Sequence, residues 1–431
     1  MLELIDVRDR LAPVHLSRPQ PVSVGADVEA SVRAIVDDVR MRGDAALIEY
    51  TERFDRARLT PGQLTVDRVT IQKARSLVRP ELIDALEVLA ERLATTCRRQ
   101  MPTSWIERSV DEFVGELIRP VRRAGLYVPG GRAAYPSSVV MAAVPAQVAG
   151  VESIALCSPP SPSGEIPEVV LAACAVVGIE EVYSIGGAQA IAALAYGTES
   201  VRPVDKIVGP GNVYVSHALR VVQQWVGVGS EAGPTEIMIV ADDSASPNVL
   251  AADLVAQAEH GPHGSHVLVS WKAEMLESVI SLLEFEVARH ERAEDVENAL
   301  TEGGSAVLVR DLQQALDTVN AFAPEHLQLV FAGAEKSLDH IRNAGSVFVG
   351  ESSPVPVGDY VGGTNHVLPT GGSARWSSGL GSHDFLKRVY VSGFEQTSLE
   401  RLAPHVNALA QAEGLPAHAR SVTARLARRR A

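Results

Sequence analysis

The sequence is poor in several residue types, and each shortage narrows what the protein can be. Its 431 residues include three cysteines, Cys97, Cys157 and Cys174, which show no paired spacing, so no disulfide framework is expected. The longest apolar run, Val169 to Ile179, is too short to cross a membrane. The first residues contain no hydrophobic segment of a secretion signal. We therefore expect a cytoplasmic protein.

Positive charge is scarce relative to negative charge. Lysine and arginine number 39 against 53 aspartates and glutamates, which gives a net charge of −14. An acidic surface argues against nucleic acid or an anionic membrane as the main partner. With 431 residues, of which 46% are hydrophobic, the chain can bury two or three cores. These bounds indicate a multidomain protein with neither nucleic acid nor membrane as a partner.

Strand and helix patterns alternate through most of the chain and predict two sheets. The first series has strands at 126–128, 153–157, 181–185 and 206–208, with helices at 138–150, 167–177, 188–196 and 212–225. The second has strands at 236–241, 266–270, 306–309, 327–331 and 347–349, with helices at 247–259, 272–290, 312–322 and 335–343. Further helices are expected at 27–56 and 81–100, and a strand with two helices after Phe385. Such alternation is typical of parallel sheets with helices on both faces.

The glycine fingerprint G-x-G-x-x-G is missing, so the pattern alone supports dinucleotide binding only weakly. Glycine turns nevertheless follow three predicted strands, at 127–131, 184–190 and 208–215. A strand–glycine–helix turn presents backbone N–H groups at a helix N-terminus, where phosphate is favoured. Gln189 and Asn212 open two of these helices and could bond a ribose or an amide, although capping and turn roles are the alternative.

A glycine-rich segment, residues 345–387, carries Asp359 and His366 without a regular period. Loops of this length inside compact domains are usually functional or disordered, and its apolar anchors argue against disorder. We expect an ordered active-site loop, with a structural connector as the alternative.

Two short motifs carry further candidate groups. Gln257 and His260 are three residues apart, so they share a helix face and could hold zinc or manganese, with Asp359 as a carboxylate ligand. Glu325 and His326 precede a predicted strand and supply two bases of different strength. Seen alone, the first motif is a weak metal signal, and the second could be a turn with solvated polar residues.

Taken together, these motifs resemble those of the histidinol dehydrogenase family, from residue 50 to residue 418. The resemblance is carried by GLYVPGG (125–131), GGAQAIAALAYGT (186–198), VDKIVGPGNVYV (204–215), AGPTEIMIVAD (232–242), DLVAQAEHGP (253–262), APEHLQLV (323–330), GDYVGGTNHVLPTGG (358–372) and AEGLPAH (412–418). It implies oxidation of L-histidinol through L-histidinal to L-histidine with two NAD, the last step of histidine biosynthesis. It also implies one zinc ion per subunit and a domain-swapped homodimer with shared active sites.

The same resemblance implies roles for individual residues. It makes Glu325 and His326 catalytic, and Tyr127, Gln189 and Asn212 NAD-binding. It makes Gln257, His260, Asp359 and, from the second subunit, His418 the zinc ligands. The implied substrate contacts are Thr235, Gln257, His260, His326, Asp359, His366, Glu413 and His418. Alternatives from the residues alone are a zinc-dependent hydrolase, an NAD-dependent dehydrogenase of a related amino alcohol, and a two-lobed binding protein.

The predicted fold class is α/β, with two doubly wound, Rossmann-like parallel-sheet domains plus small N-terminal and C-terminal, mainly helical units. We expect an N-terminal arm at 1–23 and a first domain, with the zinc and catalytic residues, at 24–126 and 237–380. An NAD-binding domain is expected at 127–236, and a dimerisation unit at 381–431.

Overall fold

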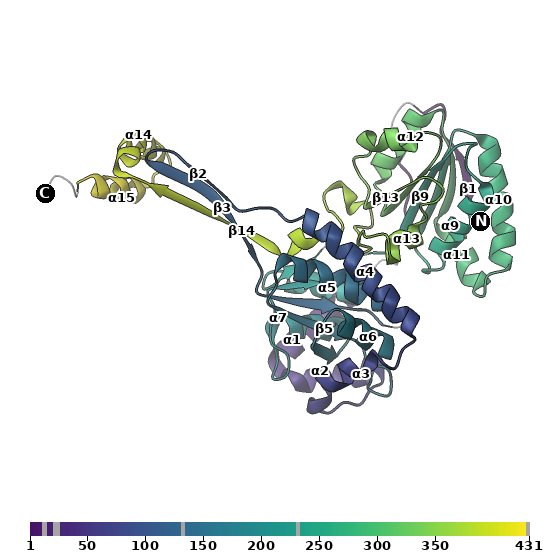
Figure 1. The fold of residues 1–431 in the computed structure, drawn as a ribbon, viewed down its shortest axis with the longest axis horizontal. Coiled ribbons are helices and arrows are strands. Elements are labelled where there is room, and N and C mark those ends of the chain that lie inside the picture. Colours follow the sequence, from purple (N-terminus) through teal and green to yellow (C-terminus); the bar gives the residue numbers. More distant parts are fainter. Residues whose placement is uncertain (11–14, 20–25, 131–133, 230–232, 428–431) are drawn as a thin grey trace. The chain divides into compact units, whose positions relative to one another are not determined.

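The computed structural model describes residues 1–10, 15–19, 26–130, 134–229 and 233–427. Parts of the predicted N-terminal arm, Gly131 of the first glycine turn and the last four residues therefore lie outside the described residues. The chain divides into two compact units. The larger comprises Met1–Gln100 and Arg122–Phe385, and the smaller comprises Met101–Val121 and Leu386–Ala431 (Figure 1).

The larger unit contains a six-stranded parallel sheet that confirms the second predicted series. Its spatial order is β1 (Glu3–Asp6), β11 (Gly304–Leu308), β10 (Ser265–Ser270), β9 (Glu236–Ala241), β12 (His326–Val330) and β13 (Ser346–Val349). The edge strand β1 was not predicted, because its ELID sequence is largely exposed and lacks an apolar alternation. It is recognised only through its parallel pairing with β11.

Helices cover both faces of this sheet. One face packs on α9 (Pro247–Ala258), α10 (Ala273–Ala288) and α11 (Ala293–Gly303). The other face packs on α12 (Leu312–Phe322) and the 3-10 helix η2 (Ala334–His340). The second of these replaces the predicted α-helix at 335–343, and α11 was not predicted.

The other parallel sheet of the larger unit has five strands and confirms the first series. Its order is β6 (Glu181–Ser184), β5 (Ser153–Ser158), β4 (Arg123–Tyr127), β7 (Lys206–Val208) and β8 (Gly227–Val228). Its helices are α5 (Pro136–Ala149), α6 (Glu168–Val176), α7 (Gly187–Tyr196) and α8 (Val213–Val222). Of these elements, β8 was not predicted, since two residues give no pattern.

The N-terminal helices also pack around this five-stranded sheet. They are α1 (Ala26–Arg42), α2 (Asp44–Asp55), α3 (Arg68–Ala74) and α4 (Pro80–Arg99). The first two share a core with α7 and α8, whereas α3 contacts α6 and α4 contacts α5 and α6. This packing differs from the sequence-based grouping, which put 24–126 with the other sheet. A linear sequence pattern shows which helix face is apolar but not which sheet that face meets.

A single glycine divides the helix that was predicted at 27–56. Gly43 has a φ of 57°, which ends α1 and lets α2 start in a new direction. The backbone N–H of Asp44 donates to the Glu199 carboxylate at 2.8 Å, which anchors the break.

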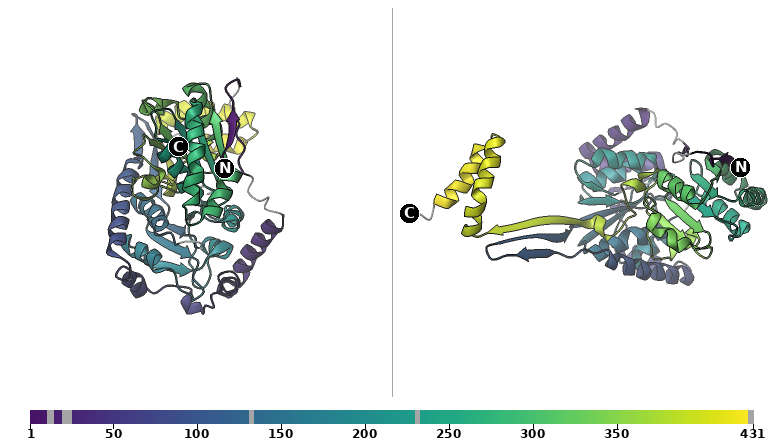
Figure 2. Two further views of the ribbon diagram at one scale, coloured as in Figure 1. Left: turned by 90° about the vertical axis from the view of Figure 1, so that its right-hand side faces the viewer. Right: turned by 90° about the horizontal axis from the view of Figure 1, so that it is seen from above.

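The smaller unit is an antiparallel ribbon that leads to a helix pair (Figure 2). Strand β14 (Leu386–Phe394) pairs with β3 (Glu112–Pro120), which pairs with β2 (Trp105–Arg108). The chain then forms α14 (Gln396–Ala412) and α15 (Pro416–Ala427), which contact each other. The predicted strand and two helices are confirmed, but the β2–β3 hairpin was missed.

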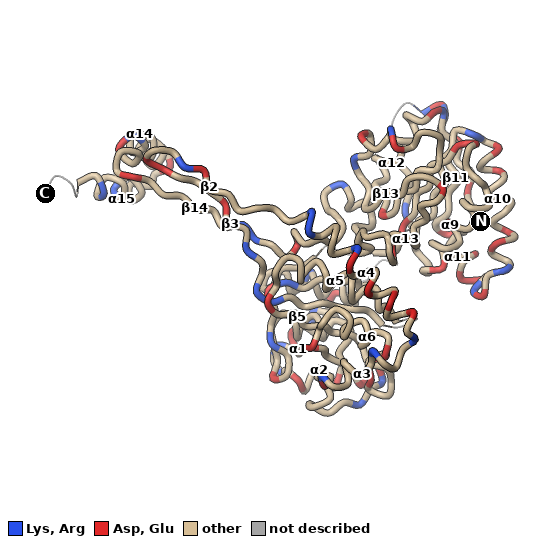
Figure 3. The backbone as a smooth tube through the Cα atoms, viewed as in Figure 1, with Lys and Arg blue, Asp and Glu red and all other residues tan. Residues whose placement is uncertain are grey.

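Charged residues of both signs are interspersed over the helices of the larger unit (Figure 3). Within the described ranges, no helix is long and apolar enough to cross a membrane.

Candidate active site

The first group of candidate residues lies where β9 and β12 begin, side by side in the six-stranded sheet. His326 is the first residue of β12 and is in register with Ile237 of β9. Glu325 directly precedes β12, and Thr235 directly precedes β9. Parallel pairing therefore brings together two motifs that are about ninety positions apart in the sequence.

Glu325 is buried, and hydrogen bonds from two donors hold one of its oxygens. The Thr235 hydroxyl and the Glu236 backbone N–H each donate to Glu325 Oε2 at 2.8 Å. The carboxylate is thereby fixed in position, with Oε1 as the oxygen that these donors do not use.

The surroundings of His326 define the tautomer of its neutral form. Its Nδ1 lies 3.0 Å from the Glu236 backbone oxygen, which can only accept a hydrogen bond. Nδ1 must therefore carry the hydrogen. His326 Nε2 faces the Asp359 carboxylate at 3.5 Å, beyond a normal hydrogen bond, and is buried. Nε2 is thus the ring atom that can accept and return a proton.

Burial and charge act on His326 in opposite directions. Burial lowers the pKa of His326, but the negative charges of Glu325 and Asp359 outweigh burial and raise this pKa to about 10. For Asp359, burial raises the pKa of the carboxyl group, but contact with His326 and the nearby His366 and His260 outweigh it and hold the pKa below its usual value. The two groups therefore stabilise each other as an ion pair.

Gln257 completes this cluster from the last turn of α9. Its Nε2 donates to the Thr235 hydroxyl and lies 3.4 Å from His326 Nδ1. The amide nitrogen is thus used inside the protein, and Oε1 is the amide atom left for a metal. His260 follows in the turn after the helix and is exposed.

Asp359 and His366 come from the glycine-rich segment, which is ordered as expected. Asp359 lies in the short helix α13 (Val355–Tyr360), which was not predicted. His366 Nδ1 lies 2.8 Å from the Asp359 backbone oxygen, and its Nε2 lies 3.2 Å from Ser138 Oγ of α5. Burial lowers the pKa of His366 and favours its neutral form. Thr235, Gln257, Glu325, His326 and Asp359 together are called the acid–base cluster below. His366 therefore links this cluster to a helix of the five-stranded sheet.

The remaining predicted substrate and zinc residues lie elsewhere. Glu413 and His418 belong to the smaller unit, at the end of α14 and in α15, where both are exposed. In the part of the chain that the structure describes, no three His, Cys, Asp or Glu side chains form a metal-binding group. Of the four expected zinc ligands, the larger unit supplies two such side chains, His260 and Asp359, together with the amide of Gln257. These donor types suit zinc.

Two residues around the cluster were missed from the sequence. Glu236 is buried beside Glu325, and its carboxylate contacts the Arg18 guanidinium at 2.5 Å. Burial and the charge of Glu325 raise the pKa of Glu236, although Arg18 opposes this effect. The sequence did contain a signal for Glu236, because a charged residue at the start of the apolar strand EIMIVA is unusual. Arg18, which stacks on the Phe322 ring at 3.8 Å, offered none.

A cavity of about 830 Å³ lies at the carboxyl ends of the five-stranded sheet. Tyr127, Gln189 and Asn212, the three residues expected to bind NAD, all line it. Tyr127 is buried and accepts a hydrogen bond from the Gly187 N–H at 3.1 Å; burial raises its pKa to about 12, so the phenol stays neutral. Asn212 Oδ1 caps α8 by accepting from the backbone of Tyr214 and Val215. Both amide atoms of buried Gln189 have no partner.

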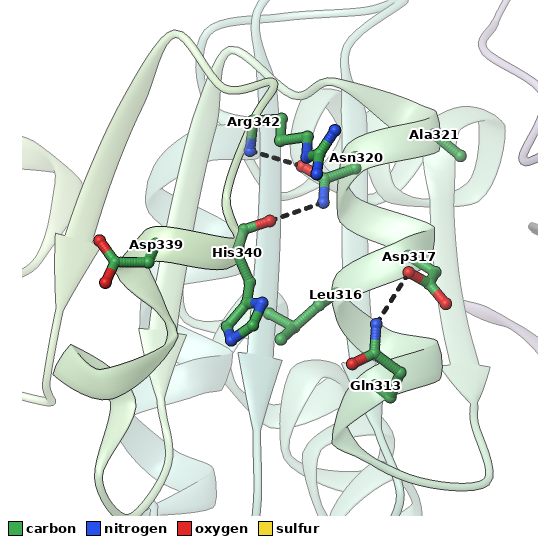
Figure 4. Close-up of a pocket in the computed structure, with 8 residues that line it drawn as sticks. All are labelled: Gln313, Leu316, Asp317, Asn320, Ala321, Asp339, His340 and Arg342. Carbon is green, nitrogen blue, oxygen red and sulfur yellow. Dashed lines mark hydrogen bonds between the residues drawn. The ribbon is translucent and has the colours of Figure 1, made fainter.

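A smaller cavity of about 400 Å³ lies beside α12 and η2 (Figure 4). Its polar groups bond to each other: Asn320 Nδ2 donates to the His340 backbone oxygen at 2.8 Å, and Asn320 Oδ1 accepts from the Arg342 N–H at 2.7 Å. It contains none of the predicted site residues, and we assign it no role.

One doubly wound sheet has a large cavity at its glycine turns, and the other has a buried histidine between carboxylates. These features define the class: a two-sheet α/β enzyme with groups suited to acid–base chemistry and a cavity suited to a ligand.

Comparison with known proteins identifies the family within this class. The family model described as histidinol dehydrogenase matches residues 19–426. Histidinol dehydrogenases of Synechococcus sp. and Rhizobium meliloti are 46% and 47% identical over 92% and 94% of this chain, covering 92% and 93% of their own lengths. The crystal structure of histidinol dehydrogenase from Elizabethkingia anophelis superposes with a TM-score of 0.91 at 33% identity, covering 100% of this chain and 99% of that one. The chain belongs to the histidinol dehydrogenase family, a family of oxidoreductases of histidine biosynthesis.

Proposed function

We propose that the protein oxidises L-histidinol to L-histidine through L-histidinal, with two molecules of NAD and one zinc ion per subunit. The observation that carries this proposal is the buried group at the start of β12. There, His326 has its Nδ1 occupied by a backbone oxygen and its Nε2 free to exchange a proton, with Glu325 beside it. Oxidation of an alcohol to an acid needs a base that acts twice and a second base that activates water.

The roles of the two bases follow from their positions. His326 Nε2 accepts the substrate hydroxyl proton in the first oxidation. Glu325 then takes a proton from the water that adds to the aldehyde, while protonated His326 returns its proton to the aldehyde oxygen. The neutral His326 accepts a proton of the resulting gem-diol in the second oxidation. Within the described chain the three cysteine thiols are buried and free, and burial raises the pKa of each, which argues against a covalent thiohemiacetal. The same reduced, buried thiols support a cytoplasmic location.

The raised pKa of His326 has a consequence for this role. An imidazole must be neutral before it can accept a proton, but the carboxylates of Glu325 and Asp359, at 3.4 and 3.5 Å, favour the protonated form of His326. Positive charge placed beside Asp359, from a metal or a substrate amine, would lower this pKa and release the base.

The cofactor residues are assigned by their donor chemistry and by the cavity. Gln257, His260 and Asp359, together with His418 of a second subunit, would hold zinc, which would position the substrate nitrogens. NAD supplies the hydride acceptor and would bind in the cavity lined by Tyr127, Gln189 and Asn212. Thr235, His366 and Glu413 are the remaining proposed substrate contacts. We assign the NAD domain to residues 127–236 with the helices of 26–100 packed around it.

A homodimer is supported by the apolar surface of the smaller unit. Tyr390 is 79% exposed and Leu409 is 65% exposed, and Trp105 and Phe394 are about half exposed. Exposed apolar groups concentrated on a small unit mark an interaction surface. We assign this surface to a second copy of the chain, whose His418 would complete the site.

A direct assay tests the proposed function. Purified protein with L-histidinol and NAD should form two NADH per histidinol consumed, and a zinc chelator should abolish this. Metal-dependent hydrolysis of a substrate without any NADH would instead favour a zinc hydrolase.

A further inference from the structure

The large cavity contains one charged side chain among its described lining residues, and that residue has no assigned role. Asp55, the last residue of α2, lines the cavity together with Phe54, Tyr127 and Gln189. Its Oδ2 is buried and has no hydrogen-bond partner in the protein. A buried carboxylate oxygen without a donor is costly, so a donor from a bound molecule would be favoured.

The position of Asp55 within the cavity identifies the part of the cofactor that it would meet. Helix α7 begins in the cavity wall at Gly187, and its N-cap residue, Gly186, has no side chain to cap it; of its first N–H groups, that of Gly187 donates to the Tyr127 hydroxyl. That end is therefore suited to phosphate groups. A carboxylate repels phosphate, so Asp55 must meet an uncharged part of the cofactor that donates hydrogen bonds.

The orientation of the cofactor follows from the two ends of the cavity. Gly130 and Ala134 line it on the chain that leads into α5, where Ser138 contacts His366 of the acid–base cluster. The reacting nicotinamide must lie toward that end. Asp55 lies on α2, which packs on α1 and α7. Phe54, its neighbour in the sequence, and Tyr214 of α8 also line the cavity; they are 49% and 42% exposed and offer aromatic faces for a base. The group beside Asp55 is thus the adenosine.

We propose that Asp55 accepts a hydrogen bond from the 2′-hydroxyl of the adenosine ribose and thereby selects NAD over NADP. This inference rests on the proposed function and adds a specificity-determining residue to it. The 2′-phosphate of NADP would place a dianion against the carboxylate, whereas a hydroxyl supplies the missing donor. Burial raises the pKa of Asp55 to about 6, which fits a carboxyl group that lacks a donor until a ligand binds.

Calorimetric titration without substrate tests this proposal on the unmodified protein. NAD should bind more tightly than NADP, and more tightly than NAD whose adenosine ribose is 2′-deoxy, by roughly tenfold to a hundredfold. Equal affinity for NAD and its 2′-deoxy form would overturn the proposal. Because this experiment uses the unmodified protein, its result does not depend on whether a variant folds.

Variants then assign the effect to Asp55. In Asp55→Asn the ratio of NADP to NAD dissociation constants should fall by at least about tenfold, and the 2′-deoxy form should bind nearly as well as NAD. Glu52→Gln is the matched control, because Glu52 lies on the same helix, contacts Arg58 at 2.6 Å and does not line the cavity. It should leave all three affinities unchanged.

The outcomes separate this inference from the proposed function. If NAD binds and L-histidinol yields NADH while the 2′-hydroxyl makes no difference, only the role of Asp55 is rejected. If NAD neither binds nor is reduced, both the proposed function and the role of Asp55 are rejected.

Discussion

The two parallel sheets of the larger unit present their functional groups in opposite ways. On the six-stranded sheet the polar groups lie at the amino ends of β9 and β12 and are paired with each other. On the five-stranded sheet the cavity lies at the carboxyl ends, and Gln189 and Asp55 are left without partners. The usual rule for doubly wound sheets places ligands at carboxyl ends, so the cavity lies where the rule expects a site and the proposed active-site residues of the six-stranded sheet do not.

This difference teaches that the polar groups of the acid–base cluster are already paired within the protein, whereas polar atoms in the cavity wall lack hydrogen-bond partners. Thr235 and the Glu236 backbone hold Glu325 and His326, the proposed catalytic pair, without help from a ligand. Preorganised charge costs no reorganisation when the reaction occurs. A buried polar group without a hydrogen-bond partner instead lowers the stability of the free protein, and a ligand that supplies the partner removes this penalty.

The largest expected effect is at the paired cluster itself. His326→Ala should lower turnover by roughly 10²–10⁴-fold, the usual contribution of a general base, while L-histidinol and NAD still bind. Steady-state rates and calorimetric titration measure the two parts. His340→Ala, at an exposed histidine of η2, is the control. Turnover within about threefold of the parent protein would remove His326 from the mechanism.

The neighbouring carboxylate should affect only one half-reaction. Glu325→Gln should slow oxidation of L-histidinal by about 10²-fold but oxidation of L-histidinol much less, because only the aldehyde step needs activated water. Single-turnover NADH formation from each substrate distinguishes the two steps. An equal loss in both would mean that Glu325 only orients His326.

The cluster is preorganised but incomplete if His418 comes from the second subunit. His418→Ala and His260→Ala homodimers should each be inactive, since neither has an intact zinc site. Mixed dimers should regain one intact site and about half of the parent activity per dimer. Mixed dimers that form without regaining activity would place His418 outside the partner's zinc site.

The smallest effects should distinguish paired from unpaired amides. Without ligand, Gln189→Leu should raise the free energy of unfolding by about 1 kcal/mol, because it removes two buried polar atoms that have no partner. Gln257→Leu should lower it by about 1–2 kcal/mol, because it breaks the hydrogen bond from the buried Gln257 to the Thr235 hydroxyl. Gln189→Leu should also weaken NAD binding about five- to tenfold. Denaturant unfolding and titration test both, and stability changes of the same sign would contradict the contrast.

Regular periodicity explains which elements were predictable. Buried strands such as EIMIVA and the amphipathic α12 have strong local patterns, and their predicted bounds match the structure. The edge strand β1 and the hairpin β2–β3 were missed because their side chains are mainly exposed or half-buried and give no clear alternation. The strands β11 and β14, which pair with β1 and β3, are also distant from them in sequence. The break at Gly43 requires a positive φ that a helical pattern does not reveal.

The sequence by itself determined the alternation of strands and helices, the adjacency of Glu325 and His326, and the three-residue spacing of Gln257 and His260, although α9 ends at Ala258 and His260 lies in the turn after it. These properties are local, because they depend on neighbouring residues and fixed helical or strand periods. Only the tertiary structure decided that the Glu236 carbonyl occupies His326 Nδ1, that Arg18 meets Glu236 across 218 positions, and that Asp55 faces the cavity. Such contacts arise from how the packed elements meet, and no local period encodes that.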